Sequence, residues 1–170
     1  MHAEHAIGGI EMEQLSRVSG NGCRSATYRI MSYDLGVWYP HEPLGNAEAT
    51  KLYVGLCEGS IEVPPGHPSV DAFYEELTAK HPEIDTVPDD RIDDHDYCPW
   101  SCALDRSPGH VIIPCVWSKA EYVDGFVRSL AGKHGLAVFD PQSGIISYPD
   151  SLPTGLVPPK AETKPWWKFW

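Results

Sequence analysis

One helix with well-marked ends lies within residues 117–144, and this segment constrains the fold more than any other part of the chain. Ser118 and Glu121 have the spacing of a capping box, in which each side chain bonds to a backbone N–H group at the helix start. Trp117 stands where a hydrophobic staple onto Tyr122 is expected. The sequence therefore predicts that the helix begins directly after Trp117.

The same helix is expected to end at Gly135, because glycine suits the left-handed backbone position that stops a helix. Two short apolar runs follow, at residues 136–139 and 145–148. Residues 140–144 between them are rich in turn-forming side chains. The sequence therefore predicts a helix followed by a β-hairpin.

Three further elements precede this segment. Residues 32–39 alternate between apolar and polar side chains and predict a strand. Asn46 can cap a helix that stops at Gly59, and Ser69 can cap a second helix that ends before Pro82. We therefore expect one strand and two helices in the first half of the chain.

Residues 110–117 are apolar on both faces and predict a buried strand. Pro114 lacks a backbone donor, so we expect this strand at an edge of the sheet or with a bulge. The elements then follow in the order β-α-α-β-α-β-β. The sequence predicts an α+β fold, a mostly antiparallel sheet with helices packed on one face.

The length of 170 residues fits one domain with tails. Residues 31–150 should form this domain, between an N-terminal extension (1–30) and a Pro-rich linker with an aromatic tail (151–170). Two interpretations of the extension remain open: Met31 is the natural start of the protein, or the extension adds a helix around residues 10–18. The tail carries four rings that we expect to pack on the protein itself or on a second copy in a homodimer, and otherwise on a partner: Trp166, Trp167, Phe169 and Trp170.

The chain carries a formal net charge of −11 at pH 7. All of it falls after residue 30, because residues 1–30 hold three acidic and three basic groups. An acidic surface repels phosphates, so nucleic acids and anionic membranes are poor candidates and a basic protein is a better one. The longest apolar runs are far shorter than the roughly 18 residues of a membrane span, which also argues against a membrane partner.

The number of cysteines is odd, and the first thirty residues lack the apolar core of a secretory signal. A reduced, cytoplasmic setting is therefore expected. The five cysteines are Cys23, Cys57, Cys98, Cys102 and Cys115.

His95, Cys98 and Cys102 lie within eight residues, with a spacing compatible with a zinc knuckle. Because no second ligand pair completes the set, a different interpretation is stronger: Cys102 and Cys115 are small buried groups, and His95 is solvated among carboxylates. The acidic neighbourhood also disfavours a reactive dithiol, which needs positive charge to lower a thiol pKa. We therefore expect no cofactor.

Residues 83–96 hold seven carboxylates against one basic residue, Arg91, and lack the apolar surface of a core element. The aspartate spacing resembles a calcium loop, but the glycine at its sixth position and the closing glutamate are missing. We expect a solvated loop that meets Lys or Arg side chains of a partner, with two apolar anchors beside it. The predicted contact residues are Asp89, Asp90, Asp93, Asp94, Asp96, Tyr97 and Trp100.

Four stretches of the chain share a pattern with a known group of proteins. They are Ser-Tyr-Asp-Leu with an aromatic strand at 32–38, Cys-Pro-Trp-Ser at 98–101, His-Gly-Leu at 134–136 and Phe-Asp-Pro-Gln-Ser-Gly at 139–144. This pattern resembles small bacterial immunity-like proteins, which are associated with genes beside polymorphic or contact-delivered toxins. The resemblance covers about residues 32–148 and brings no catalytic residues.

The resemblance implies a non-catalytic binding protein that neutralises a cognate bacterial toxin by direct contact. In this hypothesis the acidic loop faces a basic cleft of the toxin. The alternative is a metal- or thiol-dependent enzyme that uses His95, Cys98 and Cys102. Stoichiometric zinc in the purified protein would favour the enzyme.

Overall fold

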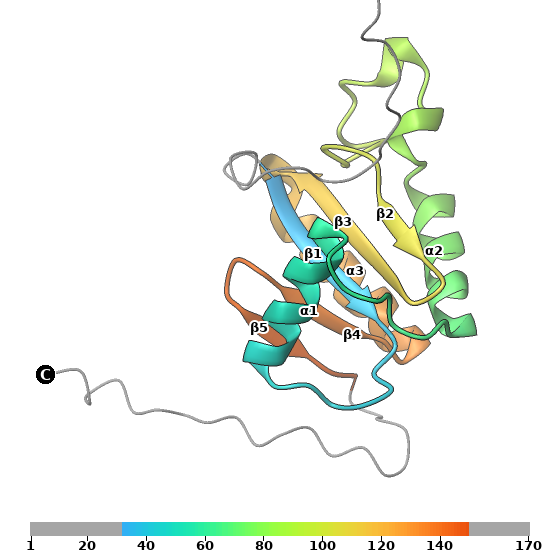
Figure 1. The fold of residues 1–170 in the computed structure, drawn as a ribbon. Helices are drawn as coiled ribbons and strands as arrows, with labels where there is room; N and C mark the ends of the chain where they lie inside the picture. Colours follow the sequence, from blue (N-terminus) through green and yellow to red (C-terminus); the bar gives the residue numbers. More distant parts are fainter. Residues whose placement is uncertain (1–31, 150–170) are drawn as a thin grey trace, which may run out of the picture.

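The computed structural model describes residues 32–149, which form a five-stranded antiparallel sheet and three α-helices (Figure 1). The predicted α+β class is therefore confirmed. The predictions for the N-terminal extension and the aromatic tail lie outside the described residues. No helix in residues 32–149 has the length and apolar character needed to cross a membrane.

The sheet is built around its first strand. In spatial order the strands run β2-β3-β1-β4-β5. β1 pairs with β3 over its whole length and with β4 over its last three residues. The strands are β1 (Ser32–Trp38), β2 (Asp105–Ser107), β3 (His110–Val116), β4 (Ala137–Asp140) and β5 (Ile145–Ser147).

Residues 32–149 contain the predicted number of helices but one strand more than predicted. β2 has only three residues, none of which is apolar, so it gave no alternating pattern in the sequence. The helices are α1 (Asn46–Glu58), α2 (Pro68–Lys80) and α3 (Ala120–His134). Three short 3-10 turns accompany them: η2 (Ile84–Thr86), η3 (Asp89–Arg91) and η4 (Trp117–Lys119).

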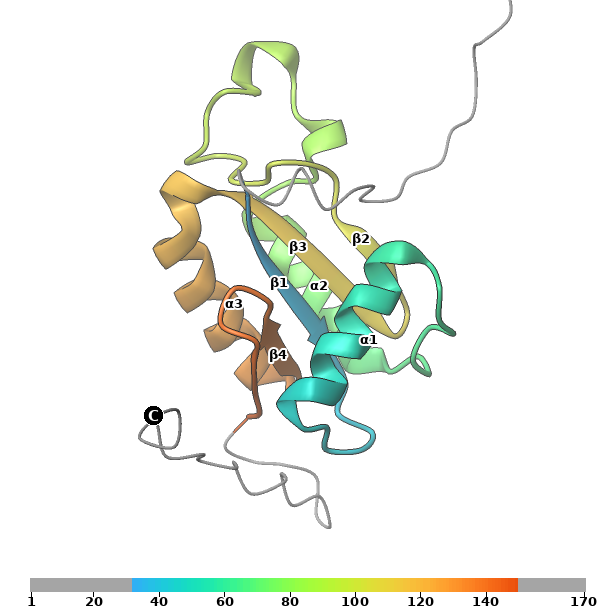
Figure 2. The ribbon, with the colours of Figure 1, turned by 60° about the vertical axis from the view of Figure 1, so that its left-hand side comes forward.

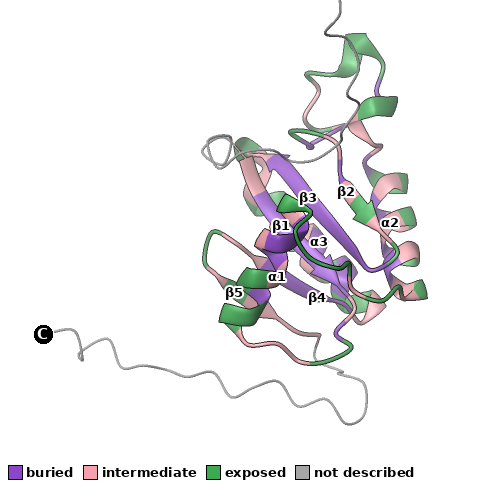
Figure 3. Ribbon diagram, in the orientation of Figure 1, coloured by how far each residue is buried: buried purple, intermediate pink, exposed green. Residues whose placement is uncertain are grey.

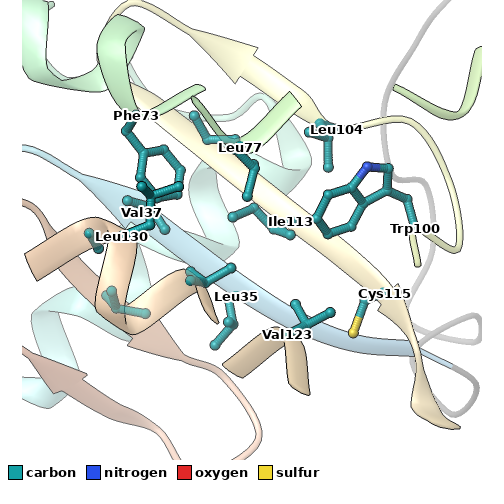
Figure 4. Packing of buried hydrophobic residues seen from close by; sticks show 14 of the residues in the cluster. Leu35, Val37, Phe73, Leu77, Trp100, Leu104, Ile113, Cys115, Val123 and Leu130 are labelled. Atoms are coloured by element: carbon teal, nitrogen blue, oxygen red, sulfur yellow. The ribbon is translucent and has the colours of Figure 1, made fainter. Parts of the chain in front are cut away.

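The larger core lies between one face of the sheet and helices α2 and α3. Leu35 and Val37 of β1 belong to it, together with Phe73 and Leu77 of α2 and Val127 of α3. All five side chains are fully buried. Figure 4 shows how the helices meet the sheet across this cluster.

The opposite face of the sheet is also apolar, and α1 covers it. Trp38 and Phe139 lie on this face, with Ala49, Tyr53 and Leu56 of α1 packed against them. The ring centroids of Tyr53 and Phe139 are 5.5 Å apart. The prediction that the helices lie on one face is therefore wrong for α1, which stands in front of the sheet in Figure 1 while α3 lies behind it. Because neighbouring residues of a strand point to opposite faces, both faces here need an apolar cover.

Pro114 does not place β3 at an edge, because β3 has neighbours on both sides and pairs with β1 without a bulge. β2 pairs only with residues 110–112, so its ladder ends before Pro114. There the N–H of Ser101 donates to the carbonyl oxygen of Pro114 over 3.1 Å. In a strand the N and C=O groups of one residue point to the same side. The C=O of Pro114 points away from β1, toward Ser101, so its N also points away from β1. The absence of an N–H at Pro114 therefore removes no hydrogen bond between β3 and β1.

The predicted helix ends are confirmed. α1 stops at Gly59 with φ 62°, and α3 stops at Gly135 with φ 69°, both in the left-handed region. The N–H of Leu136 donates to the carbonyl oxygen of Ala131 over 2.9 Å, which satisfies one of the last helix carbonyls. The predicted hairpin of β4 and β5 follows directly.

The starts of all three helices differ from the predictions. α3 begins at Ala120 after the turn η4, and no side chain among the described residues caps either element, so the predicted box at Ser118 is not formed. α2 begins at Pro68, and its cap is His67, whose Nδ1 accepts from the Ser69 N–H over 3.2 Å. Proline at the first helical position has no N–H to satisfy, which explains the earlier start.

Asn46 is the first residue of α1 and not its cap. Gly45 precedes it, and the Gly45 N–H donates to Oε2 of Glu48 over 2.7 Å. The Oδ1 of Asn46 instead accepts from the N–H of Ile146, the middle residue of β5, over 3.1 Å. β5 is an edge strand, so this side chain occupies a backbone donor at the border of the sheet.

Candidate partner-binding surface

The acidic loop, residues 83–97, follows α2 and extends beyond the sheet (Figures 1 and 2). Short backbone hydrogen bonds fold it into the turns η2 and η3. Figure 3 shows that much of this segment is exposed. Its exposed carboxylates are Asp85, Asp89, Asp90, Asp93 and Asp96.

Asp94 differs from the other predicted contact carboxylates because it bonds inside the loop. Its Oδ2 accepts from Arg91 over 2.8 Å, and its Oδ1 accepts from the Tyr97 N–H over 3.2 Å. The hydrogen bond from Arg91 holds the pKa of Asp94 below its usual value. The guanidinium of Arg91 also lies over the ring of Tyr97, 3.5 Å from its centroid. Asp94 and Tyr97 therefore support the shape of the loop.

Trp100 lies in the core, although the sequence predicted it as a partner anchor. Its side chain is 1% exposed, and its Nε1–H donates to the carbonyl oxygen of His81 over 3.4 Å. An isolated bridge to Cys115 places Trp100 beside β3, so the indole packs over the sheet (Figure 4). The anchor prediction is therefore wrong for Trp100, because sheet pairing turns this ring inward.

The predicted metal candidates are not gathered at one point. Cys98 is buried, and its S–H donates to the carbonyl oxygen of Pro82 over 3.5 Å. Cys102 is exposed, so the prediction that it is a small buried group is wrong, and His95 is half-buried. Within residues 32–149, no group of three or more His, Cys, Asp or Glu side chains is placed to hold a metal ion.

The two buried thiols have a core environment. Burial raises the pKa of Cys98 above its usual value. Burial, with a smaller contribution from Asp34, raises the pKa of Cys115 to about 12. Neutral thiols are poor nucleophiles and poor metal ligands, so Cys98 and Cys115 serve as small apolar groups of the core.

Two contacts hold the acidic loop against the start of α3. Lys119 Nζ pairs with Oδ1 of Asp96. His81 is 3% exposed; its Nδ1 lies 3.0 Å from the carbonyl oxygen of Tyr97 and its Nε2 lies 2.8 Å from the hydroxyl of Tyr122. A carbonyl oxygen can only accept, so in the neutral imidazole Nδ1 carries the hydrogen and Nε2 accepts from Tyr122. The loop and the start of α3 therefore form one surface.

Two aromatic side chains near the start of α3 are exposed, which the sequence did not predict. Trp117 is 61% exposed and Tyr122 is 46% exposed. Their predicted staple is not formed: Trp117 lies edge-on to Tyr33 at 5.9 Å, and Tyr122 stacks on Phe126 at 6.1 Å. The sequence does contain an indication of this exposure. Residues 118–121, between Trp117 and Tyr122, include no large apolar side chain that would pack in a core.

Most basic side chains of the described residues are already paired with carboxylates. The ion pairs are Arg91–Asp94, Arg106–Asp71, Lys119–Asp96, Arg128–Asp124 and Lys133–Glu76. Asp89, Asp90 and Asp93 have no ion-pair partner within residues 32–149. Together with Asp85, these three carboxylates give the loop exposed negative charge that is not held in an ion pair among residues 32–149.

A second aromatic group lies beyond the other end of β1. The rings of Tyr39 and His67 stack with centroids 3.5 Å apart, and His41 meets Tyr39 edge-on at 4.8 Å. His41 Nε2 donates to the carbonyl oxygen of Pro65 over 3.0 Å. Burial, and then the nearby His41, lower the pKa of His67. This group fastens the Pro-rich connection before α2 to the end of β1.

Comparison of the chain with protein-family models, with curated proteins and with solved structures gave no match. The resemblance to immunity-like proteins therefore stays a prediction. Function has to be inferred from the chemistry of the surface formed by the acidic loop and the start of α3.

Proposed function

We propose that this protein is a non-catalytic binding protein that neutralises a cognate bacterial toxin by direct contact. The acidic loop meets Lys and Arg side chains of the toxin and covers a basic cleft. The observation that carries this proposal is that exposed aspartates of the acidic loop, among them Asp89, Asp90 and Asp93, have no ion-pair partner in residues 32–149.

The way in which the loop is held supports a role in binding. The ion pair Lys119–Asp96 and the hydrogen bond of His81 to Tyr97 connect the end of the loop to the rest of the domain. The loop therefore loses less conformational entropy on binding a partner than an unattached loop would. Uncompensated charge at the rim of an interface mainly raises the association rate. A rapid encounter with a basic partner suits a protein that must intercept a toxin.

Other functions gain less support from the described residues. A metal- or thiol-dependent enzyme would need His95, Cys98 and Cys102 to act together, but within residues 32–149 no three such side chains are placed to hold a metal ion, and Cys98 is buried while Cys102 is exposed. Nucleic acids would meet the same carboxylates that attract a basic protein. A homodimer formed through this loop would place aspartates against aspartates.

The test is to measure association of the purified protein with the product of the neighbouring gene at several salt concentrations. Replacing Asp89, Asp90 and Asp93 by Asn should slow association about tenfold or more at low salt and flatten the salt dependence. The matched control replaces three exposed glutamates outside the loop by Gln and removes the same charge: Glu42, Glu58 and Glu62.

The control variant should keep an association rate within about twofold of the wild type, since distant charges are screened at moderate salt. Equal slowing by both variants would show that only the overall charge matters and would remove the loop from the interface. Absence of binding by the wild-type protein would reject the toxin encoded beside it as the partner.

A further inference from the structure

We propose that Ser107 is a reactive nucleophile that accepts an acyl group from an activated ester, with His110 as its general base and Asp105 as the residue that orients this base. All three lie on the hairpin of β2 and β3, at an edge of the sheet (Figure 1). The site shares no residue with the acidic loop or the start of α3. It therefore adds a covalent modification site to the proposed binding function and does not depend on that function.

The register of the sheet brings the three side chains to one face. Ser107 and His110 are direct partners in the β2–β3 ladder. Paired residues of an antiparallel ladder point to the same face, and so do residues two apart in one strand, which adds Asp105. Trp38, the partner of His110 in β1, lies on this face as well. A hydroxyl, an imidazole and a carboxylate therefore share one side of the hairpin.

The distances are those of an activated serine. Oγ of Ser107 lies 2.8 Å from Nδ1 of His110, within hydrogen-bond range. The other ring nitrogen, Nε2, lies 3.8 Å from Oδ1 of Asp105 and has no hydrogen-bond partner among the described residues. A nucleophile, a base within reach of it and a third group beside the base form the arrangement that activates a hydroxyl. Each ring nitrogen of His110 thus faces the group that this chemistry requires.

The surroundings favour the tautomer of His110 that can accept a proton from Ser107. A bare Nε2 would direct its lone pair at the carboxylate of Asp105, whereas an Nε2–H group is attracted to it. With the hydrogen on Nε2, Nδ1 is the acceptor and takes the hydrogen bond of the Ser107 hydroxyl. The imidazolium that forms after proton transfer then faces a carboxylate, which stabilises its charge.

The turn between the two strands fixes the geometry of the pair. The N–H of Gly109 donates to Oγ of Ser107 over 3.1 Å. A Cβ atom at Gly109 would lie 2.0 Å from the carbonyl oxygen of Pro64, so glycine is what allows these two backbones to approach so closely. Nucleophile and base therefore hold their positions before a reagent arrives, which is a condition for fast reaction.

The burial of the three side chains matches their roles. The side chain of His110 is 4% exposed, whereas that of Asp105 is 40% exposed and Ser107 is half-buried. A small ester can therefore reach the hydroxyl. Because the imidazole is buried, water has little access to Nδ1 once an acyl group is attached to Oγ. We therefore expect one transfer to each chain, without turnover.

The reaction balances in atoms and charge. Oγ of Ser107 attacks the carbonyl carbon of the ester, and its proton passes to Nδ1 of His110. The bond between the carbonyl carbon and the leaving oxygen then breaks, and the leaving group takes the proton from Nδ1. The products are an ester of Ser107 and a free alcohol, with His110 again neutral.

The test treats the full chain with p-nitrophenyl acetate and follows acetylation of individual residues by fragmentation mass spectrometry. Ser143 is the internal reference, because it is exposed and its Oγ donates to Oδ2 of Asp140 over 2.7 Å, a contact with a carboxylate and no imidazole. Ser107 should be acetylated at least about a hundredfold faster than Ser143. Equal rates at the two serines would overturn the proposal.

Variants of the hairpin test the two supporting roles. His110→Gln keeps a polar side chain but removes the base, and should slow acetylation of Ser107 at least about a hundredfold. Asp105→Asn changes an accessible side chain, so the protein should keep its melting temperature while acetylation slows at least about tenfold. The matched control is Asp85→Asn in the acidic loop, which should stay within about twofold of the wild type because distant charges are screened at moderate salt.

Unchanged acetylation of Ser107 in folded His110→Gln or Asp105→Asn would overturn the proposal, and Asp105→Asn decides alone if His110→Gln does not fold. Continued release of nitrophenolate by the wild type above the level of Ser107→Ala would show that the acyl group leaves again. That result would overturn the role of Ser107 as an acceptor. Failure of the neighbouring gene product to bind would reject the proposed function and leave this site in place.

Discussion

The hydroxyl of Tyr122 donates a hydrogen bond to Nε2 of His81 over 2.8 Å, so an exposed ring on α3 is anchored to a buried imidazole. The other ring nitrogen of His81 donates to the carbonyl oxygen of Tyr97, at the end of the acidic loop. One side chain thus fixes both halves of the candidate surface. The predictions below begin with this contact.

Tyr122→Phe should destabilise the protein by about 1–3 kcal/mol, because it leaves Nε2 of His81 buried without a partner. Urea denaturation measures the change. Tyr39→Phe is the control, since the Tyr39 hydroxyl makes no hydrogen bond within residues 32–149, and it should alter stability by less than about 0.5 kcal/mol. Equal unfolding midpoints for Tyr122→Phe and the wild type would refute the role of this contact.

Gly135 and Gly132 should respond in opposite directions to substitution by alanine. Gly135 has φ 69°, where an L side chain is strained, so Gly135→Ala should cost about 1 kcal/mol or more. Gly132 is exposed in α3 with open space around it, and Gly132→Ala should stabilise by about 0.5–1 kcal/mol. Thermal melting of both variants provides the check, and a shift of the same sign for the pair would contradict the helix end.

Ser118→Ala should leave the stability within about 0.5 kcal/mol of the wild type. The sequence pattern predicted a capping bond, whose loss costs about 0.5–2 kcal/mol, but Ser118 lies in η4 and α3 starts later. Chemical denaturation distinguishes the two values. A loss of stability above about 1 kcal/mol would instead support the predicted capping bond of Ser118.

His67 should make the protein less stable as the pH falls. Its folded-state pKa lies below the ordinary value of 6.5, so the unfolded chain takes up the proton first. The stabilisation is complete above pH 6.5 and is lost as the pH falls through the folded-state pKa. His67→Asn keeps a capping acceptor and removes this titration, so the stability curves of variant and wild type should diverge below pH 6.5. Parallel curves would contradict the prediction.

The parts of the fold that follow from local chemistry could be predicted from the sequence. Gly59 and Gly135 stop their helices because few other residues tolerate a left-handed backbone there, whatever surrounds them. The hairpin after α3 likewise follows from the turn residues between two apolar runs. The face that a helix covers depends instead on distant strands, so the position of α1 against Trp38 and Phe139 was missed.

Only part of the candidate site could be predicted, because local composition is visible in the sequence and contacts between distant segments are not. The acidic loop follows from composition, because carboxylates without apolar neighbours cannot enter a core. The positions of the aromatic rings depend on pairing between segments far apart in sequence. Trp100 is turned inward by its bridge to Cys115, whereas Trp117 stays exposed with its ring against Tyr33.

The hydrogen bond from Ile146 to Asn46 affects how the protein behaves in a crowded solution. An edge strand with open donors can recruit the edge of another molecule and begin a continuous intermolecular sheet. The Asn46 side chain fills the central donor of β5, so an incoming strand would have to displace α1's first residue before it could pair. This contact therefore protects the β5 edge of the sheet against pairing with a strand of another molecule.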